Sequence, residues 1–204
     1  MRLVNAASGK RILFVMATHA EYGPHLKTRF VPLITGVGPV EGGVVLTAAL
    51  AGLKTQNQLP DIVVSLGSAG SRTLEQGEVY QATYLAYRDM DASALGFEKG
   101  KTPFLALPVQ VALPFQIDGI KTAKLSTGAS VVSGTAYDAI AEHMVDMETF
   151  AHMRACDHFG VPLIAFRGIS DGAEELQHYE SWADALPALD QNLVRAVDLL
   201  LEQF

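Results

Sequence analysis

Residues 162–169 read PLIAFRGI, an almost uninterrupted apolar run that is followed at once by Ser170 and Asp171. Two further apolar runs occupy residues 12–17 and 62–66, and each is stopped by glycine or a polar residue. Runs without polar alternation predict strands that are buried on both faces, as in a parallel sheet. The three runs therefore predict the central strands of such a sheet.

Helix-like stretches lie between and after these runs. Residues 39–56 are apolar almost all round, and residues 148–159 end at Gly160, a common helix terminator. In the last twenty residues, leucine and valine recur at spacings of three and four, and Pro187 is expected in the first turn of that helix. Alternating strands and helices predict an α/β fold, with a mainly parallel sheet covered by helices in one domain that spans residues 1–204. Three other stretches are strand-like in composition: residues 77–87, 104–113 and 121–133.

The overall composition excludes several classes of partner. The formal net charge of -7 offers no basic surface for nucleic acid or anionic membranes. The apolar run at 12–17 is too short for the core of a secretory signal, and residues 42–53 fall below the ~20 residues of a membrane span. Cys156 is the only cysteine, so no internal disulfide can form, and a reducing compartment, the cytoplasm, is expected.

Polar residues follow the apolar runs wherever a strand is expected to end. They form four groups: residues 18–21, residues 67–70 (read as a turn), residues 127–130, and Ser170 with Asp171. In open α/β sheets, ligands bind beyond the carboxyl ends of the strands. These groups therefore predict one site with carboxylates, hydroxyls and exposed backbone amides along the same edge.

Two glycine-containing motifs give alternatives. Residues 36–42 resemble a dinucleotide-binding loop, but the third glycine falls one place late, and Pro39 and Glu41 stand where phosphate needs donors. Residues 168–172 match the Gly-x-Ser-x-Gly elbow of serine hydrolases, with Ser170 as nucleophile. That fold needs an acid and then a histidine well beyond the serine, whereas only His178 follows. A serine hydrolase stays open as the competitor from another reaction class.

No metal site is predicted. The pairs His19/Glu21 and Asp89/Asp91 lack a third or fourth ligand at a typical spacing. No cofactor is indicated by any other motif.

Several segments together resemble the methylthioadenosine/adenosylhomocysteine nucleosidase branch of the nucleoside phosphorylase superfamily. They occur in family order across nearly the whole chain: Val37 to Val40, Gly67 to Gly70, Asp89 to Glu98, Val145 to Glu148, and Arg167 to Asp171. The resemblance implies a three-layer α/β/α domain with a mixed, mainly parallel sheet. It also implies hydrolysis of an adenine nucleoside, in particular 5'-methylthioadenosine or S-adenosylhomocysteine, without a cofactor.

The same resemblance implies roles for individual residues. Asp171 would give a proton to N7 of adenine, Glu21 would activate the attacking water, and Glu148 would hold the ribose hydroxyls. Ser68 and Arg167 would line the water and ribose side, and Leu95 and Pro103 would reach the active site of the other subunit in a homodimer. The remaining members of the implied substrate-binding set are Val37, Val131, Val132, Met147, Ser170 and Phe97.

The chemistry suits these residue types. Adenine leaves poorly as an anion, so protonation of N7 lets it depart neutral from an oxocarbenium-like sugar. Asp171 must then keep its proton near neutral pH, which requires surroundings that raise its pKa. Glu21 favours water over phosphate, because two like charges ~4 Å apart repel by about 4 kcal/mol near a protein surface.

Departures from the family concern the substrate. Val131 stands where the family usually has a phenylalanine stacked on the base, a contact worth about 1–3 kcal/mol, and Leu95 replaces an aromatic residue. The segment between Ser133 and Met144 is shorter than in typical members. Cleavage of another purine nucleoside, by water or phosphate, and a binding protein without turnover are therefore alternatives. Retention of both acids speaks against the binding protein.

Overall fold

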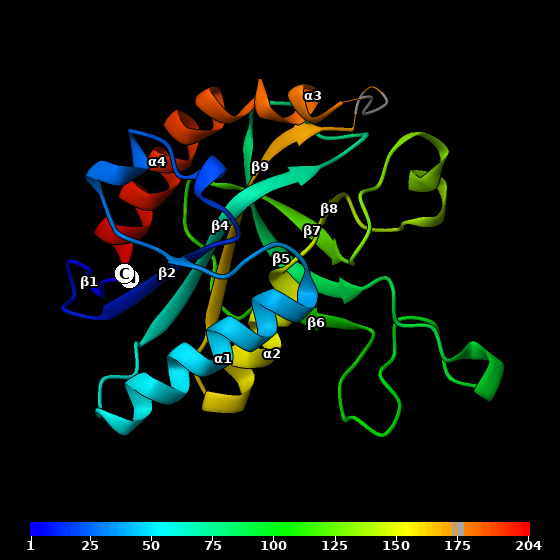
Figure 1. The fold of residues 1–204 in the computed structure, drawn as a ribbon, viewed down its shortest axis with the longest axis horizontal. Coiled ribbons are helices and arrows are strands. Elements are labelled where there is room, and N and C mark those ends of the chain that lie inside the picture. The colour runs from blue at the N-terminus through cyan, green and yellow to red at the C-terminus, as the bar shows by residue number, and fades with distance from the viewer. Residues whose placement is uncertain (173, 175–177) are drawn as a thin grey trace.

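The strands and helices of the chain alternate through most of the sequence in the computed structural model, which describes residues 1–172, 174 and 178–204 (Figure 1). The strands are β1 (Val4–Asn5), β2 (Arg11–Met16), β3 (Leu33–Ile34), β4 (Ile62–Gly70), β5 (Val79–Tyr87), β6 (Gln110–Ala112), β7 (Lys121–Thr127), β8 (Met144–Asp146) and β9 (Leu163–Asp171). The helices are α1 (Pro39–Thr55), α2 (Thr149–Phe159), α3 (Tyr179–Ala183) and α4 (Leu186–Gln203), with the 3-10 helices η1 (His19–Glu21), η2 (Leu26–Thr28), η3 (Ser93–Leu95) and η4 (Gly134–Ala139). Within the described residues, no helix is long and apolar enough to cross a membrane.

The sheet is mixed. Parallel pairs join β2 to β4, β4 to β9, β5 to β7 and β7 to β8, whereas β9 runs antiparallel to β5, and β8 antiparallel to β4. The pairings β4–β8–β7–β5–β9–β4 close on themselves, so the centre of the sheet is a ring and not the open sheet that the sequence suggested. Because β2, β4 and β9 are parallel, their carboxyl ends lie at the same edge.

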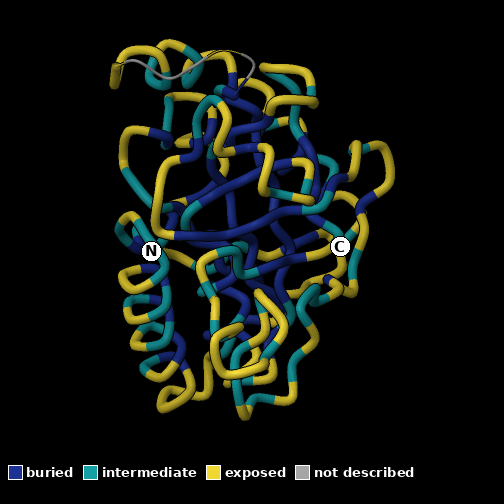
Figure 2. The backbone as a smooth tube through the Cα atoms, turned by 90° about the vertical axis from the view of Figure 1, so that its right-hand side faces the viewer, coloured by how far each residue is buried: buried dark blue, intermediate teal, exposed yellow. Residues whose placement is uncertain are grey.

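Helices cover the sheet on two sides, which confirms the three-layer prediction. The helices α1 and α2 lie on one side and α4 lies on the other (Figure 1). Leu46 and Leu50 of α1 belong to one buried cluster with Val63 of β4, while Leu193 and Val197 of α4 belong to a second one. The buried stretches run through the middle of the molecule between these layers (Figure 2). Burial of such side chains contributes about 1.5–3 kcal/mol each to folding.

Three sequence expectations need correction. The strand expected at residues 104–113 is confined to β6, because Pro108 has no N–H to give to a ladder. Residues 67–70 do not form a turn: they continue β4 beside β9, with an irregularity between Ala69 and Gly70. The strand expected at 121–133 stops at Thr127, where the chain turns at Gly128.

Candidate active site

A pocket of about 630 Å³ opens at the edge where β2, β4 and β9 end. Its size is that of a small-molecule site. The residues expected from the sequence that line it are Glu21, Val37, Ser68, Val131, Val132, Met147, Glu148, Ser170 and Asp171. Both acids to which the sequence analysis gives catalytic roles therefore face one cavity.

Glu21 lies at the end of η1, the short helix that follows β2, and is only 8% exposed. Its Oε1 accepts hydrogen bonds from the backbone N and from Oγ of Ser68, both at 2.7 Å. Gly67 leaves room for this contact, since a Cβ there would lie 3.1 Å from Oε1. Oε2 has no partner among the described residues. Burial raises the pKa of Glu21, and the two bonds from Ser68 oppose that rise. A carboxylate with a raised pKa is a stronger base towards a bound water.

Trp182 fixes the hydroxyl group beside Glu21. Its Nε1 donates to Ser68 Oγ at 2.9 Å, and Ser68 Oγ in turn donates to Glu21. Because Ser68 Oγ accepts a hydrogen bond from the indole, its own proton is directed towards Glu21. Trp182 was not predicted as a site residue, although it is the only tryptophan of the chain and lies eleven residues after Asp171.

Asp171 ends β9 and lines the same pocket. Ser170 Oγ donates to its Oδ1. Burial raises the pKa of Asp171, and the bond from Ser170 opposes this rise. A carboxyl group that holds its proton more tightly than usual can serve as a general acid.

Glu148 is the residue immediately before α2. Its Oε1 accepts a hydrogen bond of 2.8 Å from the backbone N of Gly38, at the start of α1. Burial, followed by the nearby negative charge of Asp146, raises its pKa to about 7. This carboxyl group can therefore bind neighbouring hydroxyl groups as either acceptor or donor.

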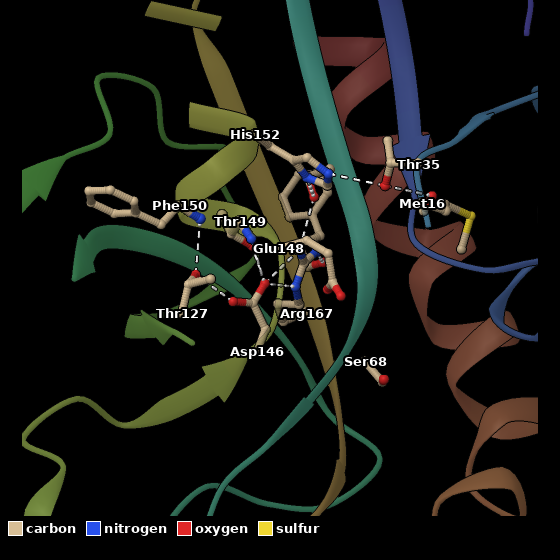
Figure 3. Close-up of polar contacts among 12 residues, drawn as sticks. Met16, Thr35, Ser68, Thr127, Asp146, Glu148, Thr149, Phe150, His152 and Arg167 are labelled. Atoms are coloured by element: carbon tan, nitrogen blue, oxygen red, sulfur yellow. Dashed lines mark hydrogen bonds and ion pairs between the residues drawn. The ribbon is translucent and has the colours of Figure 1, made fainter. Parts of the chain in front are cut away.

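Arg167, which the family resemblance places on the water and ribose side, is not among the residues that line the pocket. Its side chain is 2% exposed and donates to Asp146 Oδ2 at 3.0 and 3.1 Å, to Ser65 Oγ at 2.9 Å and to Thr149 Oγ1 (Figure 3). Thr127 Oγ1 also donates to Asp146, at 2.6 Å. Although burial opposes ionisation, Arg167 and these hydroxyl donors keep the pKa of Asp146 below its ordinary value. The buried Arg167–Asp146 ion pair therefore holds Asp146, which lines the pocket, in place.

His152 extends the same buried network. Its Nδ1 lies 3.0 Å from Ser65 Oγ, and its Nε2 lies 3.2 Å from Thr35 Oγ1 (Figure 3). Burial lowers its pKa to about 3, so the ring is neutral.

We expect Asp146→Ala to destabilise the fold by about 3–5 kcal/mol, because it leaves the buried charge of Arg167 unpaired. The matched control is Asp198→Ala, which breaks a solvent-screened surface pair with Arg29, so a much smaller loss of stability is expected. Urea unfolding of both variants measures the difference. Equal losses in the free energy of unfolding would show that the buried Arg167–Asp146 pair stabilises the fold no more than the surface pair does.

The structure gives the serine-hydrolase alternative no support. Ser170 is fully buried within β9 and its hydroxyl is bonded to Asp171 and to the carbonyl of Ala69, with no histidine bonded to it within the described part of the chain. Nor do three His, Cys, Asp or Glu side chains of the described residues gather closely enough to hold a metal ion.

Besides Arg167, three residues expected at the site lie outside the pocket of their own chain: Leu95, Phe97 and Pro103. Leu95 is 78% exposed in η3, and Phe97 packs edge-on against Phe104, with ring centres 5.6 Å apart.

Besides Trp182, the pocket has lining residues that were not expected in the site from the sequence, among them Arg88, Asp146, His178 and Tyr179. Arg88 donates to the backbone carbonyls of residues 126, 128, 130 and 146, so it holds the loop after β7 against β8.

Comparisons with known proteins agree with this arrangement. The family model described as Phosphorylase superfamily matches residues 15–202. The 5'-methylthioadenosine/S-adenosylhomocysteine nucleosidase of Actinobacillus succinogenes is 31% identical over 161 residues, covering 70% of this chain and 67% of the relative. The protein of the same name from Bacillus subtilis is 28% identical over 207 residues, covering 90% and 85%.

Solved structures share the fold. The nucleosidase of Neisseria meningitidis in complex with methylthio-immucillin-A superposes with a TM-score of 0.77 at 20% identity, covering 95% of this chain and 99% of that one. Futalosine hydrolase of Helicobacter pylori superposes with the same TM-score at 19% identity, covering 95% and 97%. Taken with the pocket, its acids and the match over residues 15–202, these similarities show that the chain belongs to the phosphorylase superfamily and, within it, to the 5'-methylthioadenosine/S-adenosylhomocysteine nucleosidase family.

Proposed function

We propose that the protein hydrolyses the N-glycosidic bond of 5'-methylthioadenosine, S-adenosylhomocysteine or both, and releases adenine and a 5-thio-substituted ribose. The observation that carries this proposal is the placement of two acids, the buried Glu21 and the partly buried Asp171, in one pocket with Glu148. The names of the relatives support the substrate class, because proteins from Actinobacillus succinogenes and Bacillus subtilis are nucleosidases for these two compounds.

In this proposal the acids act on opposite sides of the sugar. Asp171 transfers its proton to N7 as the bond from C1' to N9 breaks, so that the electron pair of that bond leaves with neutral adenine. Glu21 accepts a proton from water as the water oxygen bonds to C1'. Ser68, held by Trp182, still has a lone pair with which to orient that water. Glu148 holds the ribose hydroxyls.

A panel of nucleosides tests the proposal. Purified protein is mixed with methylthioadenosine, adenosylhomocysteine, adenosine, deoxyadenosine and inosine, and the free base is followed by chromatography. We expect adenine to be released fastest from the two thio-substituted nucleosides. Release of no base from any member would refute the proposed activity.

A second candidate is cleavage of another 5'-modified purine nucleoside. It is favoured by Val131, which lines the pocket, is 67% exposed and offers no ring to stack on adenine. The same panel separates the two candidates, since the second requires that another nucleoside exceed both thio-substituted ones.

We further propose that the protein works as a homodimer with shared active sites. Large apolar side chains stand out from the surface of the single chain: Leu95 is 78% exposed, Phe104 is 99% exposed, and Val40 and Val44 of α1 are 72% and 62% exposed. Where such side chains form a contiguous patch, they mark a surface that binds another protein. Light scattering is expected to give twice the 21.9 kDa mass of the chain, and a fully active monomer would contradict the proposal.

The cytoplasm is the compartment that we propose for this activity. The single cysteine, Cys156, is buried, and burial raises the pKa of its thiol, so it stays an inert protonated group. Fractionation of the native cells with an antibody against the protein would test this placement.

A further inference from the structure

Tyr137 has a buried hydroxyl group for which the described residues offer no partner. The residue lies in η4, is 7% exposed, and packs with Val132 and Val145 behind the wall of the pocket. An unpaired buried hydroxyl costs free energy, because it has lost its bonds to water without replacement. The presence of this unpaired hydroxyl group is explained if it gains a hydrogen-bond partner at some stage of the reaction.

The neighbour of this hydroxyl is the proposed general acid. A Cβ built on Gly70 would collide with the Tyr137 hydroxyl and would lie 2.9 Å from Asp171 Oδ2. Both oxygens thus approach the same point above β4, and they can do so because residue 70 carries no side chain. The charged groups that act on Tyr137 are Asp171, Arg88 and Arg72, the last with its guanidinium 5.9 Å from the ring centre.

Asp171 changes charge during the proposed reaction, and this change creates a need for a donor. Its Oδ1 already accepts from Ser170. When its proton passes to N7, the carboxyl group becomes a carboxylate in surroundings that disfavour charge. A second O–H donor close by would stabilise that carboxylate and so assist the proton transfer.

We propose that Tyr137 is a positioning residue whose hydroxyl turns to Asp171 and donates a hydrogen bond to the carboxylate formed as the substrate is protonated. The inference rests on the proposed function. One proton moves, from Asp171 to N7, and Tyr137 keeps its own. Burial, followed by the negative charge of Asp171, raises the pKa of Tyr137 to about 12, so the phenol remains a neutral donor at every working pH.

The test is Tyr137→Phe, which removes the hydroxyl and keeps the ring that packs with Val132 and Val145. We expect kcat to fall about tenfold to a hundredfold, the effect of one hydrogen bond to a charged group, with KM within about twofold. We also expect the basic limb of the pH profile to move to higher pH. A donor to the carboxylate favours ionisation, so its loss raises the pKa of Asp171, and the protonated form persists further.

Two controls distinguish this role from a structural one. Tyr84→Phe removes the hydroxyl of a surface tyrosine on β5, 40% exposed, and should leave kcat and the pH profile unchanged. In an Asp171→Asn background, Tyr137→Phe should lower kcat no further, because the group through which it acts is gone. A fall in kcat with an unmoved basic limb, or equal losses with and without Asp171, would overturn the inference. Absence of base release by the unchanged protein would instead refute the proposed function.

Discussion

Replacing Asp171 by asparagine is expected to lower kcat for adenine release by about 10²–10⁴-fold, the range of general acid catalysis. The amide has nearly the shape of the carboxyl group, so the fold is expected to survive, but it has no acidic proton for N7. The pKa of Asp171 is raised by burial, so the unchanged protein should lose activity as pH rises through that pKa, and the variant should lack this limb. Initial rates of adenine release across pH measure both effects.

The control for this prediction is Asp118→Asn, an exposed aspartate in the turn before β7 that is not among the residues lining the pocket. A second substrate sharpens the test. The 4-nitrophenyl glycoside of 5-methylthioribose needs no proton to release its leaving group, so Asp171→Asn should cleave it with a much smaller loss. A loss of equal size on both substrates would remove Asp171 from the role of acid.

Glu21→Gln is expected to have an effect of similar size, about 10²–10⁴-fold on kcat, because water then has no base to take its proton. Gln can still accept from the N–H and O–H of Ser68, so KM is expected to change little. The sign of the pH effect is opposite to that for Asp171. Glu21 acts when it is ionised, so activity of the unchanged protein is lost as pH falls through its raised pKa.

Glu202→Gln is the matched control, since Glu202 is exposed near the end of α4. The readout is adenine release under saturating substrate, with thermal unfolding to show that each variant is folded. Near-normal turnover by Glu21→Gln would mean that the water is activated by another group, and the proposed arrangement of the site would fail.

The sequence was sufficient for the main features of the fold because those features follow from local patterns. The apolar run at 162–169 became β9, and the leucines spaced by three and four after Pro187 became the buried face of α4. The closed ring of strands was not predictable in the same way. It depends on pairings such as Val79 with Gly168, which no local pattern encodes.

The position of the pocket could be predicted from the sequence because two of its acids stand where predicted strands end. Glu21 follows β2 and Asp171 ends β9, so parallel pairing through β4 brings them to one edge. Trp182 and Tyr137 could not be found in that way, because their importance lies in contacts with Ser68 and Gly70 that are distant in sequence. Arg167 shows the converse: a residue of the same strand as Asp171 can have its side chain buried in the core, where it donates to Asp146.

The central claim is that Glu21 activates water, and the most direct test is the dependence of adenine release on phosphate. Purified protein freed of phosphate is given methylthioadenosine with increasing inorganic phosphate, and the sugar product is analysed in ¹⁸O-labelled water. We predict that the rate without phosphate is undiminished and that the label enters the sugar at C1. Strict dependence on phosphate, with a sugar 1-phosphate as product, would contradict the account.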